Sequence, residues 1–380
     1  MRILLIDQFG DLGGAQRCLL EAAAGFQARG WEVHAAIPNP GPLAEALRPL
    51  ARATHFIPCG PFTPARKNAS DGLRFAAQIP RQAIALRGIA DRARIDMLYV
   101  NGPRLLPAAA LARGSRALIF HAHSIVSQPA ARRLAAWALR AGQAGVLASS
   151  QFVARSIGPD ARGRVQVIYN GVQGFGCAPR PRLRHTHIVA LGRIAPEKGQ
   201  LEFVRAARLA SRDRPDLRFT VCGAPMFSRA GYLEAVQAEA WDLVRLAGWT
   251  DDAGAFLSQA DVLVVPSAPI DTNPRVIPEA FAAGVPVVAF ASGGIPELIE
   301  HGVSGILVAP RTPERLAESI LAAVREPAAL NAMAERAYAR WQRLYTLGRF
   351  QSEVCEAVET ALRRHRQRTQ LRSAGAKARA

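Results

Sequence analysis

The sequence lacks the features that mark disulfide-bonded, zinc-binding or membrane-spanning proteins. Its five cysteines are scattered, with no Cys-x-x-Cys pair and no Cys/His spacing typical of a zinc site. Their dispersal and odd number argue against a disulfide framework and indicate a reducing compartment. Because no window approaches the roughly 18 uncharged apolar residues of a membrane span, we expect no transmembrane helix. The first residues, MRILLIDQFG, predict a β-strand rather than a secretory signal.

Acidic residues are scarce relative to basic ones. The chain has 48 Lys and Arg against 30 Asp and Glu, a formal net charge of +18, which favours anionic partners. Helix-turn-helix, aromatic RNA-binding and zinc-finger patterns are absent, so we expect no nucleic-acid partner. An Asp-x-Asp pair, which would suit a divalent ion beside a diphosphate, is also absent, so we expect no metal and no other cofactor.

Short apolar runs alternate with helical patterns along the whole chain. This alternation predicts βαβ units and parallel sheets. A Gly-, Pro- and Arg-rich segment at 173–187 separates two such series. We therefore predict an α/β fold of two doubly wound, Rossmann-like domains facing a central cleft. The predicted parts are a first domain at 1–175, a linker at 176–185, a second domain at 184–340, a helix at 341–362 and a basic, disordered tail at 363–380.

In each predicted domain, one segment of interest directly follows the first strand. In DLGGAQR, Gly13 and Gly14 would place bare amides at a helix N-terminus, an anion-binding arrangement, although a plain turn would also require glycine. In LGRIAPEKG, Arg193 and Lys198 would suit a diphosphate, because Arg offers a planar fork of donors and Lys a point charge. A solvated basic loop is the alternative for this second segment.

Two carboxylates, Asp271 and Glu279, stand in a loop and helix between two strands that we expect to be buried. A carboxylate near a helix start can accept hydrogen bonds from a vicinal diol such as a ribose. A turn-forming Asp and a helix-start Glu are equally common without a ligand. Gly293 and Gly294 precede a further helix and form a second predicted amide nest.

His121 and His123 end an apolar strand of the first domain. We expect strand alternation to point the two rings to opposite faces, so that only one can serve a site. His123, nearer the carboxyl end of the strand, is the candidate for a hydrogen bond to a sugar hydroxyl or leaving group.

These motifs together resemble family 4 of the retaining, nucleotide-sugar-dependent glycosyltransferases, whose two-Rossmann-domain fold is called GT-B. The resemblance spans almost the whole chain. It is carried by GGAQR, IYNGV at 168–172, LGRIAPEKG, AGWTDD at 247–252, and the block from 271 to 308. The family motif in that block is Glu, seven residues, Glu, and this chain has Asp271 in the first place.

The resemblance implies a role for each matching residue. Arg193 and Lys198 would stabilise the departing nucleoside diphosphate, Asp271 would contact the donor sugar, and His123 would lie beside it. Glu279 would bind the ribose. The remaining donor-binding positions implied are Gly13, Gly14, Trp249, Asn273, Pro274, Arg275, Val276, Gly293 and Gly294. The first domain would bind the acceptor, and the helix at 341–362 would cross back to it.

The implied function is sugar transfer to a glycan or lipid-linked acceptor in envelope polysaccharide or glycoconjugate synthesis. Asp271 is one methylene shorter than Glu, so a non-catalytic nucleotide-sugar-binding relative remains an alternative. A nucleotide-sugar 2-epimerase of the same architecture is another. The loop at 62–70 is where we expect acceptor specificity.

Arginines near apolar side chains raise the question of an anionic membrane surface as a further partner. Arg81, Arg87, Arg92 and Arg94 fall in one expected helix, and Arg132, Arg133 and Arg140 surround Trp137 in another. Such helices suit docking at an anionic leaflet, and ordinary solvated helices explain them as well. We expect a cytoplasmic protein, and peripheral attachment at the inner face of the membrane stays an open hypothesis.

Overall fold

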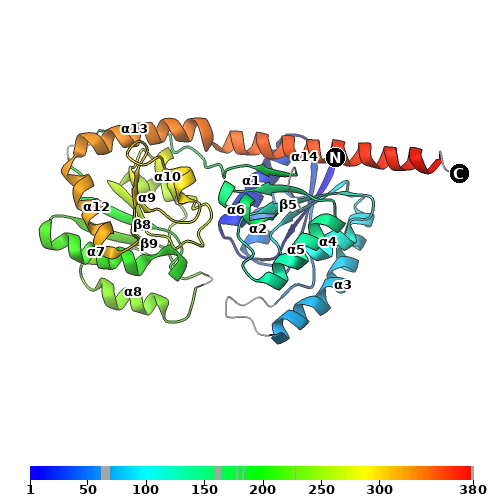
Figure 1. Ribbon diagram of the computed structural model, residues 1–380, viewed down its shortest axis with the longest axis horizontal. Coiled ribbons are helices and arrows are strands. Elements are labelled where there is room, and N and C mark those ends of the chain that lie inside the picture. Colours follow the sequence, from blue (N-terminus) through cyan, green and yellow to red (C-terminus); the bar gives the residue numbers. More distant parts are fainter. Residues whose placement is uncertain (61–68, 159–163, 177–178, 182–183, 227, 378–380) are drawn as a thin grey trace. The chain divides into compact units, whose positions relative to one another are not determined.

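The computed structural model describes residues 1–60, 69–158, 164–176, 179–181, 184–226 and 228–377, and the chain divides into two compact units. Unit 1 comprises Met1–Tyr169 and Gly348–Ala380, and unit 2 comprises Asn170–Leu347. Each unit is a parallel sheet with helices on both faces (Figure 1). The two predicted α/β domains are therefore present, with the boundary a few residues earlier than the predicted 175. The predicted loop at 62–70 lies largely outside the described residues.

Unit 1 has seven parallel strands in the order β3-β2-β1-β4-β5-β6-β7. The strands are β1 Arg2–Asp7, β2 Glu32–Ile37, β3 Ala53–Phe56, β4 Met97–Asn101, β5 Ala117–Ala122, β6 Gly145–Ala148 and β7 Val165–Val167. The helices are α1 Gly14–Ala28, α2 Pro42–Leu47, α3 Ala69–Arg92, α4 Leu106–Ala112, α5 Pro129–Ala141, α6 Gln151–Ser156 and α14 Leu347–Lys377. The strand β3 was not predicted, because ATHF is short and only half-buried.

Unit 2 has six parallel strands in the order β10-β9-β8-β11-β12-β13. They are β8 His187–Leu191, β9 Arg218–Cys222, β10 Val244–Leu246, β11 Val262–Val265, β12 Val287–Phe290 and β13 Ile306–Val308. The α-helices are α7 Gln200–Asp213, α8 Tyr232–Ala240, α9 Ala253–Ser258, α10 Val276–Ala282, α11 Ile295–Leu298, α12 Pro313–Arg325 and α13 Pro327–Leu344, and a 3-10 turn spans Pro196–Lys198.

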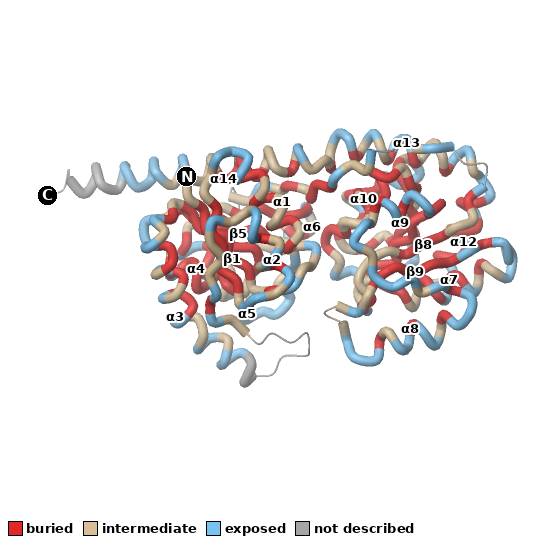
Figure 2. The backbone as a smooth tube through the Cα atoms, turned by 180° about the vertical axis from the view of Figure 1, so that it is seen from behind, coloured by how far each residue is buried: buried red, intermediate tan, exposed pale blue. Residues whose placement is uncertain are grey.

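Burial follows the strands in both units (Figure 2). In β1, every residue from Ile3 to Asp7 is fully buried, as expected for a central parallel strand covered by helices on both faces. Alternate residues of β1 and β4 pack against α3 and α4. In β1 and β4 the residues before the last one are apolar from Ile3 and Met97 onward, so the polar side chains Asp7 and Asn101 lie at the carboxyl edge of the sheet, where α/β folds form their sites.

The C-terminal region differs from the prediction. A break at Tyr345 and Thr346 separates α13 from α14, so 341–362 is not one helix, and α14 continues to Lys377 through most of the predicted disordered tail. The cause is composition: the tail has no proline, and Arg, Gln, Leu and Ala sustain a helix. Contacts with the rest of unit 1 also hold α14, among them Arg29 with Glu359 at 2.9 Å and His365 Nε2 with the Ser115 carbonyl at 2.7 Å.

None of the helices in the described part of the chain has both the length and the apolar composition needed to cross a membrane.

Candidate functional site

In unit 2, three segments that are far apart in the sequence meet at the carboxyl ends of β8, β11 and β12. Those three strands are neighbours in the sheet. The amide of Ala268, after β11, donates to the Glu197 carbonyl, after β8, over 2.9 Å. The amide of Gly294, after β12, donates to the Asp271 carbonyl over 3.1 Å. The backbone itself therefore brings the predicted residues Arg193, Lys198, Asp271 and Gly294 into one place.

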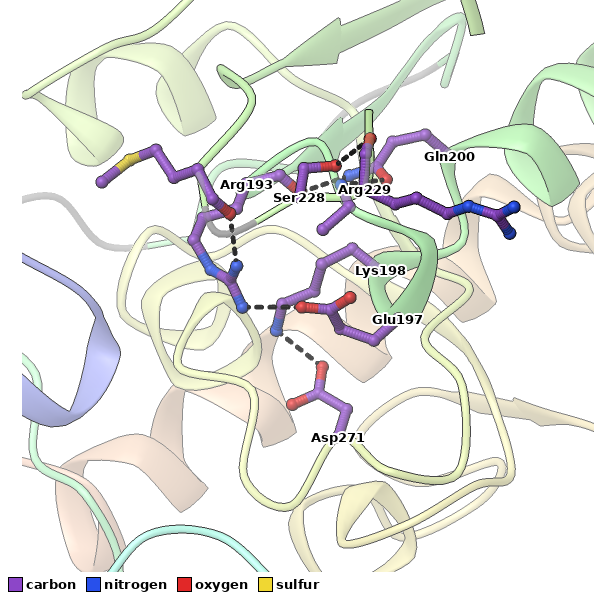
Figure 3. A network of polar contacts seen from close by, with 9 residues as sticks. Arg193, Glu197, Lys198, Gln200, Ser228, Arg229 and Asp271 are labelled. Atoms are coloured by element: carbon purple, nitrogen blue, oxygen red, sulfur yellow. Dashed lines mark hydrogen bonds and ion pairs between the residues drawn. The ribbon is translucent and has the colours of Figure 1, made fainter. Parts of the chain in front are cut away.

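Lys198 and Asp271 form a direct ion pair, although 73 residues separate them. Lys198 Nζ lies 2.7 Å from Asp271 Oδ2 (Figure 3). The Lys198 side chain is 22% exposed and the Asp271 side chain 10%. This pair joins the predicted diphosphate-binding cation to the predicted sugar-binding carboxylate.

Arg193 lies at the end of β8 with two partners that sequence reasoning did not identify. Its guanidinium donates to Glu197 Oε1 over 2.9 Å and to the Met226 carbonyl over 2.6 Å (Figure 3). No sequence signal marked Glu197, because Arg193 lies in the loop between β8 and the 3-10 turn, where helical spacing does not apply. Each predicted phosphate-binding cation therefore already has a carboxylate partner within the unit.

Close backbone approach requires glycine at two positions of this site. Gly199 has φ +72°, and a Cβ there would lie 2.0 Å from the Pro266 carbonyl oxygen. Gly293 has φ +55°, and a Cβ there would lie 2.1 Å from the Asp271 carbonyl oxygen. Any side chain would push apart the loops that hold Lys198 and Asp271.

Glu279 lies in the first turn of α10, as predicted, and 3.8 Å separates its Oε1 from the Nε of Arg275, one turn earlier. Both side chains are nearly buried, at 13% and 11% exposed. Of the other predicted residues of this segment, Asn273 and Pro274 precede the helix and Val276 is its first residue; Asn273 is 9% exposed.

Trp249 lies apart from these residues. It follows β10, which β9 separates from β8, and the residue is 44% exposed. The indole nitrogen donates to Asp251 over 2.8 Å. Trp249 is therefore carried by a strand that lies two places from β8 in the sheet.

In unit 1, the prediction that the Gly13–Gly14 segment offers bare amides needs correction. The Gly13 N–H donates to Gln16 Oε1 over 3.1 Å, because Gln16 occupies the third position of α1 and reaches back to the helix start. This amide is therefore used within the protein. Gly14 is the first residue of α1.

The prediction that His121 and His123 point to opposite faces was wrong. Residues two apart in a strand share a face, and the two ring centroids lie 4.0 Å apart. His121 is fully buried, and its Nδ1 lies 2.6 Å from the Tyr99 hydroxyl. Burial, with His123 nearby, holds the pKa of His121 well below its usual range. His123 Nε2 lies 2.7 Å from Asn101 Oδ1.

A buried polar group behind His123 was missed by sequence reasoning. The group consists of Asp7, Gln16 and Asn101, which contacts His123. Asp7 is fully buried at the end of β1, and Asn101 Nδ2 donates to its Oδ2 over 2.5 Å. Burial raises the pKa of Asp7 to about 6, against the lowering effect of its hydrogen bonds. The available signal was a polar residue at the end of two apolar strands, RILLID and MLYVN.

Among the residues with described positions, no group of three or more His, Cys, Asp or Glu could hold a metal ion.

Two protein-family models match the chain, one in each unit. The model described as Glycosyltransferase Family 4 matches residues 12–173, and the model described as Glycosyl transferases group 1 matches residues 185–326. Between them, they cover every predicted site residue.

The curated relatives include two bacterial enzymes. Exopolysaccharide phosphotransferase SCO2592 of Streptomyces coelicolor is 31% identical over 252 residues, 64% of this chain and 26% of that protein. A GDP-mannose-dependent alpha-(1-6)-phosphatidylinositol monomannoside mannosyltransferase of Mycobacterium tuberculosis is 35% identical over 148 residues, 35% of this chain and 37% of that protein. The matches thus span between 26% and 37% of these relatives' own length.

A solved structure shares the fold over nearly the whole chain. Alr3699/HepE of Anabaena, in complex with UDP, matches with a TM-score of 0.78 and 23% identity, covering 95% of this chain and 100% of that one. The predicted architecture of two parallel-sheet, Rossmann-like domains is therefore confirmed.

Proposed function

Because the chain belongs to glycosyltransferase family 4, we propose that it moves a sugar from a nucleoside-diphosphate-sugar to a glycan or lipid-linked acceptor. The pathway would be envelope polysaccharide or glycoconjugate synthesis. The observation that carries the proposal is the Lys198–Asp271 pair beside Arg193 at the carboxyl ends of β8 and β11. A carboxylate and two cations at one edge suit a sugar next to a diphosphate.

The chemistry follows from where charge develops. When the bond between the sugar C1 and the diphosphate oxygen breaks, negative charge grows on the diphosphate. Fixed cations aimed at that charge stabilise the transition state more than the ground state. Arg193 is held in place by Glu197 and the Met226 carbonyl, so little reorganisation is needed for it to act. We propose that no metal ion is required.

Lys198 has to change partners in this scheme. In the structure it is paired with Asp271. As the diphosphate takes the ammonium group, the Asp271 carboxylate becomes available to accept hydrogen bonds from sugar hydroxyls. Glu279, near the start of α10, would accept from the ribose hydroxyls. Retention of anomeric configuration, with the acceptor attacking the face that the diphosphate leaves, is part of the proposal.

The proposal leaves the nucleotide of the donor open between uridine, guanosine and adenosine diphosphates. The Anabaena neighbour is seen with UDP, and the mycobacterial relative is named for GDP-mannose. The donor panel should therefore contain both nucleotides and ADP.

A membrane-associated acceptor is a further part of the proposal, together with a cytoplasmic location. Trp137, on α5, is 39% exposed, and the helix carries basic residues around it. Arg94 lies beyond the end of α3 with φ +50°, so it does not extend that helix's basic face. We expect the protein to pellet with anionic liposomes at low salt. If it stays in the supernatant, the proposed membrane association is wrong.

The test is release of nucleoside diphosphate from each donor, with and without an acceptor-lipid extract, with the anomeric configuration of the product read by NMR. Acceptor-dependent release from one donor is expected. A 2-epimerase would change the sugar without acceptor, and a binding protein would release nothing. Lys198→Met should abolish release, whereas Arg205→Met, which breaks an ion pair with Glu239 elsewhere in unit 2, should not.

A further inference from the structure

The carboxylate of Asp7 is surrounded by hydrogen-bond donors. Its Oδ1 accepts from the Phe9 amide over 2.8 Å, and both of its oxygens accept from Gln16 Nε2, over 3.0 and 3.1 Å. Asn101 Nδ2 donates to Oδ2 over 2.5 Å. A carboxyl group that only accepts is in its ionised form. Asp7 is thus a buried negative charge held by four hydrogen bonds.

This carboxylate fixes the orientation of the Asn101 amide. The Nδ2 of Asn101 donates to Asp7 and also to the Ala15 carbonyl, over 3.2 Å. Both partners are acceptors, so the NH2 end of the amide must face them and Oδ1 must face His123. Oδ1 lies 2.7 Å from His123 Nε2. Because an amide oxygen can only accept, the proton of this hydrogen bond belongs to His123 Nε2, which leaves Nδ1 as the acceptor of the neutral ring.

The same carboxylate also holds the start of α1. Gln16 donates to Asp7 with its Nε2 and accepts from the Gly13 amide with its Oε1. The Gln16 amide is therefore oriented by Asp7 in the same manner as that of Asn101. One buried carboxylate is therefore linked by hydrogen bonds, through Gln16 and Asn101, to both the Gly13 amide and His123.

We propose that Asp7 is a positioning residue that acts through Asn101 to hold His123 with its proton on Nε2, and through Gln16 to hold the turn at Gly13. In the enzyme this would fix the tautomer that the His123 ring presents to a bound ligand. Only that last step rests on the proposed function.

The first test is the protonation state of His123 in the full-length protein, read by long-range 1H–15N NMR above pH 7. We expect the proton on Nε2, in slow exchange with water because it is hydrogen-bonded to Asn101. A proton on Nδ1 with bare Nε2 would overturn the proposal, since it would require the opposite orientation of the Asn101 amide.

Two variants and a control extend the test. Asp7→Asn removes the charge and replaces one of the two acceptor oxygens by an NH2 donor, so the Asn101 amide is oriented mainly by its longer hydrogen bond to the Ala15 carbonyl. We therefore expect the single protected Nε2 proton to be replaced by a mixture with the Nδ1 form. Asn101→Ala should remove the protection directly. Tyr99→Phe breaks the hydrogen bond to His121 in the same buried region and should leave the His123 proton in place. A single protected Nε2 proton in both Asp7→Asn and Asn101→Ala would overturn the proposal.

Kinetics separates positioning from a purely structural role. Loss of one hydrogen bond to the donor weakens its binding by roughly two- to tenfold, so we expect Asp7→Asn to raise the donor KM by about that factor. A variant that is only less stable would lower kcat through the active fraction, with KM unchanged, and that result would contradict the positioning role. If the NMR results hold and no transfer is found with any donor, the proposed function fails and the positioning role stands.

Discussion

Asp271→Asn is expected to tighten the binding of free nucleoside diphosphate. In the structure, the Asp271 carboxylate forms an ion pair with the Lys198 ammonium group at 2.7 Å, so a diphosphate must displace this carboxylate to bind Lys198. Asparagine has almost the same shape and no charge. A hydrogen bond with a charged partner contributes about 1.5–3 kcal/mol net, and the asparagine amide retains part of it. The competition removed is therefore about 1–2 kcal/mol, which corresponds to roughly five- to thirtyfold in Kd.

In the Asp271→Asn variant, the affinity for the nucleotide-sugar donor should rise less than the affinity for the free diphosphate. In the proposed mechanism Asp271 accepts hydrogen bonds from the sugar, and an amide replaces them poorly. The ratio of the Kd of diphosphate to that of the matching donor should therefore fall in the variant. Stability should also fall by about 1–2 kcal/mol, between the ranges for exposed and buried ion pairs, because the Lys198 and Asp271 side chains are 22% and 10% exposed.

Isothermal titration calorimetry at two salt concentrations measures these changes. Glu239→Gln is the matched control, since it neutralises the carboxylate paired with Arg205 on the α7 and α8 surface, and it should leave both Kd values unchanged. If Asp271→Asn weakens diphosphate binding or leaves it unaltered, Asp271 does not compete for Lys198 and the exchange of partners is wrong.

Three further outcomes follow from the structure. Gly293→Ala should cost at least about 2 kcal/mol in chemical denaturation, because its Cβ would lie 2.1 Å from the Asp271 carbonyl; Gly302→Ala, at φ +74° with no atom near, should cost less. The pKa of Asp7 rises from 3.8 to about 6 on folding, so folding favours its protonated form, and the free energy of unfolding should fall by about 2 kcal/mol as the pH rises from 4 to 6. Asp7→Asn should lack this decline, and an identical pH slope would refute it. Glu279→Gln should weaken the binding of nucleoside diphosphate, measured by calorimetry, and leave the binding of inorganic diphosphate unchanged. An equal loss of affinity for both ligands would contradict a contact between Glu279 and the ribose.

The strands and their boundaries could be predicted because each is an apolar run that ends in a polar or turn residue. The predicted runs RILLID and ADVLVVPS contain β1 and β11. The half-buried β3 has no such run, and a helix-forming, proline-free tail could not be distinguished from a disordered one by its charge. Pairing with β2 forms the strand in the first case, and helix-forming composition extends α14 in the second.

The site was predicted as a set of strand-end residues, and its pairings were not. Sequence position placed Lys198 and Asp271 at the same edge of a sheet, but their contact depends on how two loops close. Asp7 and Asn101 were missed because a single polar residue after an apolar run is common at strand ends. Only the three-dimensional structure shows that both are buried and share a hydrogen bond.

The most direct test of the central claim, metal-independent diphosphate binding by Arg193 and Lys198, is the thermal unfolding of the protein with UDP, GDP and ADP and their sugars, with and without chelator. A ligand that binds only the folded protein stabilises it by roughly 2.7 kcal/mol at a hundredfold excess over Kd. The account predicts a rise in Tm with one nucleotide class that persists in chelator and is lost in Lys198→Met. No rise with any nucleotide, or a rise that requires metal or survives Lys198→Met, would contradict it.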